Sequence, residues 1–291
     1  METTELLKKV RKIEIKSKGL TNQIFAGQYH SAFKGKGMAF SEVREYQYGD
    51  DIRNIDWNVT ARFNNPFVKI YDEERELTVI LLIDVSNSNQ FGTVKQFKEE
   101  MICEIAALLS FSAIKNNDKV GIIFFSDIIE KFIPPKKGTT HILRIIRELI
   151  DFQPNNKGTD IAEALRFLTN AIKKRSTAFL LSDFIDNNNF EDALKIANKK
   201  HDVVAIKIND NREREIPDIG FARVRDAESG RIIWVDTSDV LVRKQYFDYY
   251  IKSELKHKDS FSKAGVDIVS IKTDQDYIKP LMNFFKRRGS R

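Results

Sequence analysis

The chain has 291 residues, of which 42% are apolar and 31% are charged. This composition excludes a disordered protein, which would be less apolar, and an integral membrane protein, which would be less charged. No apolar run approaches the roughly 18 to 20 residues of a membrane-spanning helix, and the charged N-terminal residues are not typical of a secretory signal. A single cysteine, Cys103, is typical of a reducing compartment, and four histidines argue against a zinc site. We therefore expect a globular, cytoplasmic protein.

The net charge of +6 is concentrated at the two ends of the chain. Residues 1–40 hold eight Lys or Arg and three Asp or Glu, and residues 276–291 hold five and one. Basic ends are usually solvated, but they can also bind nucleic acid or anionic lipid. The sequence contains no nucleic-acid-binding motif, so we favour solvated ends. An adaptor for nucleic acid or an anionic lipid surface is kept as an alternative function.

From residue 76 onward, short apolar segments alternate with longer segments of helical periodicity. The segments that predict strands are residues 76–84, 120–125, 128–133, 177–182, 203–208 and 266–271. The segments that predict helices are residues 93–114, which open with a capping box of Thr93 and Gln96, and residues 141–150, 161–173, 190–199, 239–263 and 277–286. A hairpin is predicted over residues 221–224 and 231–235, joined through residues 228–230.

Strands that are apolar throughout and alternate with helices are typical of a parallel sheet covered on both faces. We therefore predict an α/β fold with a doubly wound, mostly parallel sheet. Residues 128–133 alternate in polarity and end at two prolines, which predicts an antiparallel edge strand. The sheet domain would span residues 76–291, with the hairpin inserted near residues 219–236. Residues 1–75 would form an N-terminal segment packed on this domain.

Polar side chains follow the first predicted strand. The sequence Asp-Val-Ser-Asn-Ser places Asp84, Ser86 and Ser88 on one side of the loop, where a carboxylate and two hydroxyls can converge. Nucleophilic catalysis is not indicated, because neither serine lies in a Gly-x-Ser-x-Gly elbow and no histidine is placed as a base. An aspartate-based phosphatase would need a second carboxylate where Ser86 stands. The set suits a hard divalent cation such as Mg²⁺, which prefers oxygen ligands.

Two further ligands follow from the predicted topology, because ligands of such sheets bind beyond the carboxyl ends of the strands. Asp183 follows the strand at residues 177–182 and should lie at the same edge as the first loop. Two Lys-Gly-Thr triplets offer another hydroxyl, that of Thr139 or that of Thr159. The antiparallel edge strand returns the chain to the opposite edge before Thr139, and the next helix brings it back before Thr159. We therefore assign Thr159 to the site.

This pattern resembles the metal-ion-dependent adhesion site of von Willebrand factor A domains. The five matching residues are Asp84, Ser86, Ser88, Thr159 and Asp183. The resemblance implies that the hydroxyls contact Mg²⁺ (or Mn²⁺ or Ca²⁺) directly, that the aspartates hold it directly or through water, and that an acidic side chain of a protein partner completes the coordination. Taken singly, each residue also suits an ordinary turn or a helix N-cap.

The segment before the sheet resembles a second family. Residues 37–72 interleave charges of both signs with Tyr, Trp and Ile, and they closely resemble the family called domain of unknown function 58 (DUF58). The residues that carry the resemblance are Arg44, Glu45, Tyr46, Gly49, Asp50, Asp51, Arg53, Asp56, Trp57 and Arg62. Family members are often encoded near MoxR-type AAA+ ATPases, so the resemblance implies such an ATPase as the partner.

If the family resemblance is set aside, the residue types alone predict a network of ion pairs that holds the segment on the sheet domain. Arginine suits such a network because it forms partly buried, bidentate pairs with carboxylates. The network would join Arg44, Arg53 and Arg62 to Glu45, Asp50, Asp51 and Asp56. The alternatives are a docking surface and a catalytic carboxylate cluster. Catalysis is disfavoured because no general base or nucleophile accompanies the acids.

These observations favour a non-enzymatic, metal-dependent protein–protein interaction module, an adaptor or chaperone-like partner of a MoxR-type ATPase. The first alternative is a metal-dependent hydrolase whose ion activates water, which is disfavoured because no general base accompanies the five ligands. The second is the adaptor that acts through its basic ends. The sequence has no Walker A motif, so we do not expect this chain to bind nucleotide.

Overall fold

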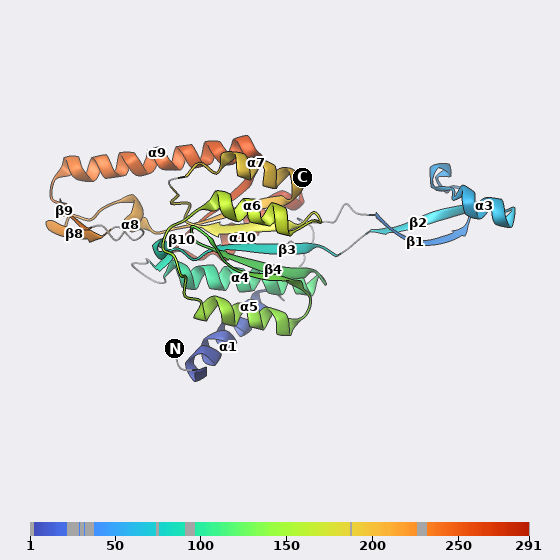
Figure 1. Cartoon of the computed structure of the whole chain (residues 1–291), viewed down its shortest axis with the longest axis horizontal. Coiled ribbons are helices and arrows are strands. Elements are labelled where there is room, and N and C mark those ends of the chain that lie inside the picture. The colour runs from blue at the N-terminus through green and yellow to red at the C-terminus, as the bar shows by residue number, and fades with distance from the viewer. Residues whose placement is uncertain are drawn as a thin grey trace. The chain divides into compact units, whose positions relative to one another are not determined.

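The computed structural model describes residues 3–21, 29, 32, 38–73, 76–90, 97–186, 188–225 and 232–290. Contacts divide the chain into two units (Figure 1). The sheet unit comprises Met1–Phe33 and Thr78–Arg291, and the hairpin unit comprises Lys34–Leu77. The boundary at residue 77 lies close to the one predicted at residue 75. Residues 1–33, however, belong to the sheet unit, whereas the prediction joined them to the segment that follows.

The sheet unit is built on six strands in the order β10-β7-β6-β3-β4-β5. Their bounds are β3 Thr78–Asp84, β4 Lys119–Phe125, β5 Ile129–Lys136, β6 Thr177–Ser182, β7 Asp202–Asn209 and β10 Asp267–Lys272. All neighbouring strands are parallel except β4 and β5, which are antiparallel. The predicted doubly wound, mostly parallel sheet with an antiparallel edge strand is therefore confirmed. The edge strand was predicted to end at the two prolines, but it continues through Pro134 and Pro135 to Lys136, and it tolerates the prolines as the last strand of the described sheet.

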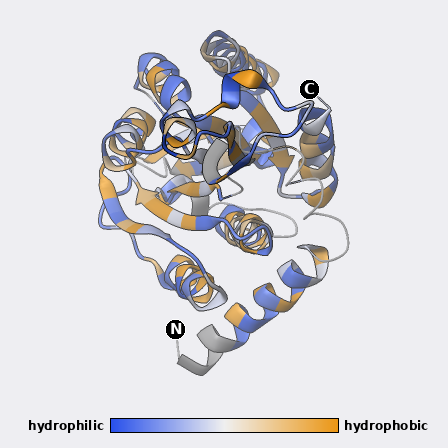
Figure 2. Ribbon diagram, turned by 90° about the vertical axis from the view of Figure 1, so that its right-hand side faces the viewer, coloured by the Kyte–Doolittle hydropathy of each residue, from blue (hydrophilic) through white to orange (hydrophobic). Residues whose placement is uncertain are grey.

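Helices cover both faces of this sheet. Their bounds are α1 Thr3–Leu20, α4 Lys98–Lys115, α5 Thr139–Asp151, α6 Ile161–Ala171, α7 Glu191–Lys200, α8 Asn211–Arg214, α9 Val240–Ala264 and α10 Ile278–Gly289. Helices α4 and α5 lie on one face, and α6, α7 and α9 lie on the other (Figure 1). Figure 2 shows the helices on both sides of the central strands. Each helix predicted from the sequence is present, although the capping box of Thr93 and Gln96 lies outside the described residues.

Helix α1 forms an outer layer on α4 and α5, which explains why the first residues belong to the sheet unit (Figures 1 and 2). Its Lys16 Nζ lies 2.5 Å from Glu104 Oε2 on α4. The hydroxyl of Thr21 lies 3.4 Å from that of Ser112, and both side chains are buried. The charged and apolar residues of the N-terminal segment, which argued against a secretory signal, therefore form an amphipathic helix.

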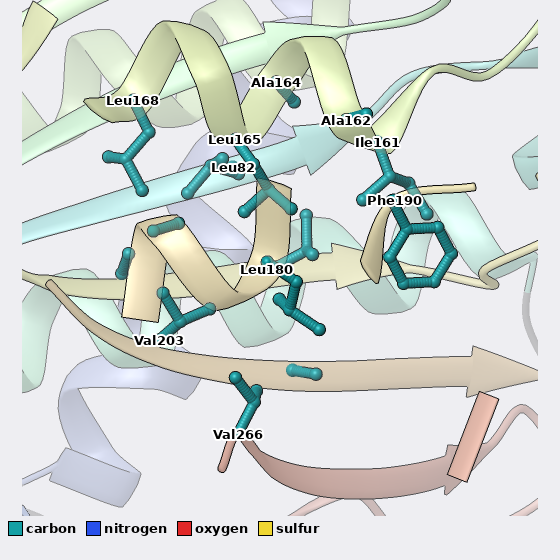
Figure 3. Packing of buried hydrophobic residues seen from close by; sticks show 14 of the residues in the cluster. Leu82, Ile161, Ala162, Ala164, Leu165, Leu168, Leu180, Phe190, Val203 and Val266 are labelled. Atoms are coloured by element: carbon teal, nitrogen blue, oxygen red, sulfur yellow. The ribbon is translucent and has the colours of Figure 1, made fainter. Parts of the chain in front are cut away.

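The core lies between the sheet and its helices. On the α6–α7 face, Leu82 and Leu180 of the sheet pack beneath Leu165 of α6 and Phe190 (Figure 3). The intervening strand residues are also buried on the opposite face, which is why the strands are apolar throughout. Cys103 is buried in α4.

Gly121 allows strand β5 to approach β4 closely. A Cβ atom at this position would lie 2.9 Å from Pro135 N, 3.0 Å from Ile133 O and 3.1 Å from Ile80 Cδ1. The pairing of the two strands shifts at the same place, between Val120 and Ile122. A residue without a side chain is therefore required where the proline-containing edge strand bends over its neighbour.

The predicted hairpin insertion is confirmed as β8 Phe221–Arg225 and β9 Ile232–Asp236, an antiparallel pair. Its predicted tip at residues 228–230 lies outside the described residues. Phe221 stacks on Trp234 with ring centroids 5.8 Å apart, and both rings are largely exposed, at 70% and 64%. In the part of the chain that the structure describes, no helix is long and apolar enough to cross a membrane.

The hairpin unit has its own small fold. Strands β1 Met38–Glu45 and β2 Phe67–Glu73 pair antiparallel, and between them lie the short 3-10 helix Ile52–Asn54 and helix α3 Trp57–Phe63. None of these elements was predicted, because the segment lacks the long apolar periodicity from which the sheet unit was recognised.

Candidate metal centre

Four of the five predicted ligands lie at or just after the carboxyl ends of β3 and β6, and Thr159 lies in the loop between α5 and α6. Asp84 ends β3, and Asp183 follows the adjacent parallel strand β6. Backbone hydrogen bonds tie the loop after Asp84 to its neighbours, from Val85 N to Phe125 O at 2.9 Å and from Asn87 N to Lys157 O at 3.2 Å. The second bond places the loop that carries Thr159 beside the loop that carries Ser86 and Ser88. The three loops therefore meet, as the topology predicted.

The rejected alternative, Thr139, lies elsewhere. It begins α5 directly after β5, which runs antiparallel to β4 and so ends at the opposite edge of the sheet. Thr139 is exposed, whereas Thr159 is 6% exposed. Thr159 therefore lies in the loop beside Ser86 and Ser88, and Thr139 lies at the opposite edge.

All five side chains at the edge are buried. Asp84 and Ser86 are 1% exposed, Asp183 is 2% exposed, and Ser88 and Thr159 are 6% exposed. Burying polar groups costs free energy unless they have hydrogen-bond partners. The partners of Asp84 include Ser86 N, which donates to its Oδ1 at 3.0 Å, and Ser182 Oγ, which donates to its Oδ2 at 2.6 Å. The hydroxyls of Ser86 and Ser88 lie 2.9 Å apart and bond to each other.

The two carboxylates repel each other. Burial, and next the nearby charge of Asp183, raise the pKa of Asp84 to about 6, although hydrogen bonds from Ser182 and Ser86 act in the opposite direction. Two buried acids at adjacent strand ends create a local negative potential. A cation is therefore the natural counter-charge for this edge.

The structure provides such a cation within the chain. Lys98, the first residue of α4, is fully buried, and its Nζ lies 2.8 Å from Asp183 Oδ2. The other oxygen of this carboxylate accepts from Ile185 N at 3.0 Å. The ammonium of Lys98 also pairs with Glu213 of α8. Burial alone would lower the pKa of Lys98, but the two carboxylates outweigh burial and raise it, so the ammonium stays charged.

Glu213 is held in place by the end of strand β7. Asp210 follows this strand and caps α8, and a capping box forms in which Glu213 Oε2 accepts from Asp210 N at 3.0 Å. Asp210 Oδ2 in turn accepts from Thr273 Oγ1 at 2.6 Å. Glu213 therefore reaches Lys98 from a third strand end, with its side chain 15% exposed.

Sequence reasoning missed Lys98, Glu213 and Ser182. One signal was present for Lys98, because it lies on the apolar stripe of its helix with Met101, Ile102 and Ile105. A lysine on such a stripe is buried and must find a carboxylate. The four-residue helix that carries Glu213 has no periodicity from which it could be recognised.

The donor set fits a hard divalent cation in its chemistry, since it offers two carboxylates and three hydroxyls, all buried at one edge. Among the described residues, no group of three or more His, Cys, Asp or Glu side chains is arranged to hold a metal ion. A metal at this edge would thus depend on hydroxyl ligands besides Asp84 and Asp183. The ammonium on Asp183 is the feature that the predicted arrangement did not include.

The predicted ion-pair network of the hairpin unit is present in part. Arg44 binds Asp50 in a bidentate pair, with Nη2 2.7 Å from Oδ1 and Nη1 2.8 Å from Oδ2. This pair, together with Gln47 N, lowers the pKa of Asp50. Asp56 caps α3 by accepting from Asn58 N at 3.0 Å. Asp56 also accepts from Val59 N at 3.2 Å, and its Oδ2 lies 3.5 Å from Lys69 Nζ of β2.

The remaining residues of the motif have local roles or are exposed. Asp51 accepts from Arg53 N at 2.9 Å and so caps the 3-10 helix. Gly49 has a φ of +106°, which favours glycine in the turn that Asp50 closes. The ring of Trp57 is 70% exposed. Two other members of the motif, Glu45 and Arg62, are exposed. The last member, Tyr46, donates its backbone N–H to Pro66 O, just before β2, at 2.8 Å.

The network is smaller than predicted because two acids cap helices that the sequence did not reveal. Within the described ranges, neither Arg53 nor Arg62 has an ion-pair partner within 4 Å, and both are exposed. Acceptors at helix N-termini satisfy backbone N–H groups that have no partner in the helix. Asp51 and Asp56 serve this purpose and are not paired with arginine.

Comparisons with known proteins identify relatives of the whole chain. The family model described as "Protein of unknown function DUF58" matches residues 42–256. An uncharacterized protein of Mycobacterium tuberculosis strain H37Rv is 28% identical over 298 residues, which cover 100% of this chain and 92% of the relative. The uncharacterized protein YeaD of Bacillus subtilis is 29% identical over 123 residues, which cover 42% of this chain and 27% of YeaD.

Solved structures with a similar fold include the conserved hypothetical protein BatB from Bacteroides thetaiotaomicron. It has a TM-score of 0.50 and 19% identity, over 74% of this chain and 100% of BatB. The similar chains also include the von Willebrand A domain of SpRpn10, with a TM-score of 0.39 and 11% identity over 72% of this chain and 94% of the domain. At this level of identity, BatB shows a shared fold.

Proposed function

The chain belongs to the DUF58 family, and on this premise we propose that it is a metal-dependent protein–protein interaction module. The observation that carries the proposal is the burial of Asp84 and Asp183 at adjacent strand ends, where loops bring hydroxyls beside them. The resemblance to the adhesion site of von Willebrand A domains supports the same reading.

In this proposal, Asp84, Ser86, Ser88, Thr159 and Asp183 hold the cation. A bound Mg²⁺, Mn²⁺ or Ca²⁺ offers a positively charged contact to an acidic side chain of a protein partner. The chain's own groups keep this contact ordered. Ser182 fixes one oxygen of Asp84, and the backbone of Ile185 fixes one oxygen of Asp183.

The partner that we propose is a MoxR-type AAA+ ATPase, as the family resemblance implies, with this chain as its adaptor. The alternative adaptor, for nucleic acid or anionic lipid, gains less support, because part of the terminal charge is neutralised within the chain. Arg288 pairs with Asp202 and lies 3.3 Å from Asp267, and Lys16 pairs with Glu104.

Isothermal titration of the full chain with MnCl₂ tests the metal site, with Asp84→Asn and Thr159→Ala as site variants. Thr139→Ala is the matched control, because it removes the hydroxyl of the other Lys-Gly-Thr triplet at an exposed position. We expect binding in the wild type and the control, at least tenfold weaker binding in Thr159→Ala and none in Asp84→Asn, since a lost ligand worth ~1.4 kcal/mol is a factor of ten. Equal binding in all four proteins would refute the assignment.

The partner is tested by capture of the MoxR-type ATPase encoded by the same genome. We expect capture in Mg²⁺ and loss of capture in EDTA or with Asp84→Asn. Capture that is unchanged in EDTA would show that the interaction does not pass through the metal.

A further inference from the structure

Asp183 and Glu213 share one buried ammonium, that of Lys98. Lys98 lies between Asp183, at 2.8 Å, and Glu213, and all three side chains are at most 15% exposed. A buried lysine with two carboxylate partners is costly to build, since each charge loses its hydration. Burial lowers the pKa of Lys98, and each of the two carboxylates raises it. So costly an arrangement calls for a reason.

Charge balance suggests that reason. The three carboxylates of Asp84, Asp183 and Glu213 exceed the single ammonium of Lys98 by two negative charges. A divalent cation supplies the two missing charges. The cluster is then neutral when Asp84 and Asp183 face the cation and Lys98 faces Glu213. The contact of Lys98 with Asp183 conflicts with this division.

We infer that Lys98 and Glu213 set the affinity of the edge for its divalent cation. The ammonium of Lys98 competes with the cation for the carboxylate of Asp183. When Asp183 binds the cation, Glu213 becomes the partner of the ammonium. This inference rests on the proposed function. Lys98 extends from the first turn of α4 and Glu213 from α8, so the exchange needs a change in one lysine side chain and no movement of the sheet. The capping box holds Glu213 ready to accept it.

The test is titration of the full chain with MnCl₂ in four proteins: wild type, Lys98→Met, Glu213→Gln and the double variant. Methionine fills the volume of the lysine stem. Lys263→Met is the control, because Lys263 Nζ pairs with Asp259 at 2.6 Å near the end of α9, which precedes the start of β10 and so lies toward the opposite edge of the sheet. Circular dichroism and melting curves establish that each variant is folded.

Removal of Lys98 should tighten Mn²⁺ binding roughly tenfold or more, because the competitor of the cation is lost. Glu213→Gln should weaken binding, because Lys98 then has Asp183 as its remaining partner. The decisive quantity is the coupling between the two changes. Glu213→Gln should weaken Mn²⁺ binding more in the wild-type background than in the Lys98→Met background. If Glu213 acted merely as a nearby negative charge, its loss would weaken binding equally in the two backgrounds.

The outcomes separate the two proposals. If neither the wild type nor Lys98→Met binds Mn²⁺, the metal site itself is wrong. If both bind with equal affinity, or if the two changes are additive, the metal site stands and the competition by Lys98 is refuted. Should Lys98→Met fail to fold, Glu213→Gln decides, because binding that is unchanged or tighter in this variant overturns the inference.

Discussion

Replacing Ser182 with alanine should destabilise the sheet unit more than its size suggests. The buried hydroxyl makes two hydrogen bonds, donating to Asp84 Oδ2 at 2.6 Å and accepting from Phe184 N at 2.9 Å. Phe184 is fully buried and has a φ of +61°, an unfavourable conformation for a residue with a side chain. The hydrogen bond to its N–H helps to hold this turn.

The magnitude follows from the groups left without partners. A hydrogen bond to a charged group contributes about 1.5–3 kcal/mol, and an unsatisfied buried N–H costs about 1–3 kcal/mol. Because the two effects share one site and are not additive, we expect Ser182→Ala to lower the free energy of unfolding by about 3 kcal/mol. Urea unfolding followed by circular dichroism measures the change.

Ser110→Ala provides a matched control, because Ser110 is equally buried. Its hydroxyl donates to Ala106 O at 2.7 Å in the middle of α4, where the carbonyl also accepts the helical hydrogen bond. The control should therefore lose about 1 kcal/mol or less. Equal losses in the two variants would refute the idea that Ser182 supports the edge.

Two further predictions concern stability. Burial lowers the pKa of His201 and His257 to about 4, below the usual 6.5, so the unfolded chain binds more protons between these values and stability should fall as the pH drops from 7 toward 4. We expect a loss of about 2 kcal/mol for each histidine across this range in urea unfolding, and a pH profile that is equally steep when both are glutamine would contradict this cause. Gly121→Ala should cost about 1–3 kcal/mol by overpacking beneath β5, and unchanged stability in the same assay would mean that the edge strand moves aside freely.

The strands of the sheet unit could be predicted because parallel strands buried on both faces must be apolar throughout. The same topology placed Asp84 and Asp183 at one edge and separated Thr159 from Thr139. The hairpin unit could not be predicted in this way. Its α3 has no buried residue in the described structure, so the periodicity that reveals a packed helix is absent.

The missed residues of the site share a physical cause. A residue that directly follows a strand is positioned by the sheet, and its location can be inferred from the order of the strands alone. Lys98 and Glu213 instead reach the edge from the starts of two helices, and the cost of burying their charges is offset by their contact with each other and with Asp183. The two residues that offset each other's charge, Lys98 and Glu213, are 115 positions apart. A single sequence contains no local pattern that would indicate such a distant pair. The positions of Asp84 and Asp183 at the edge can therefore be inferred from the sequence, whereas the positions of Lys98 and Glu213 become visible once the helices are in place.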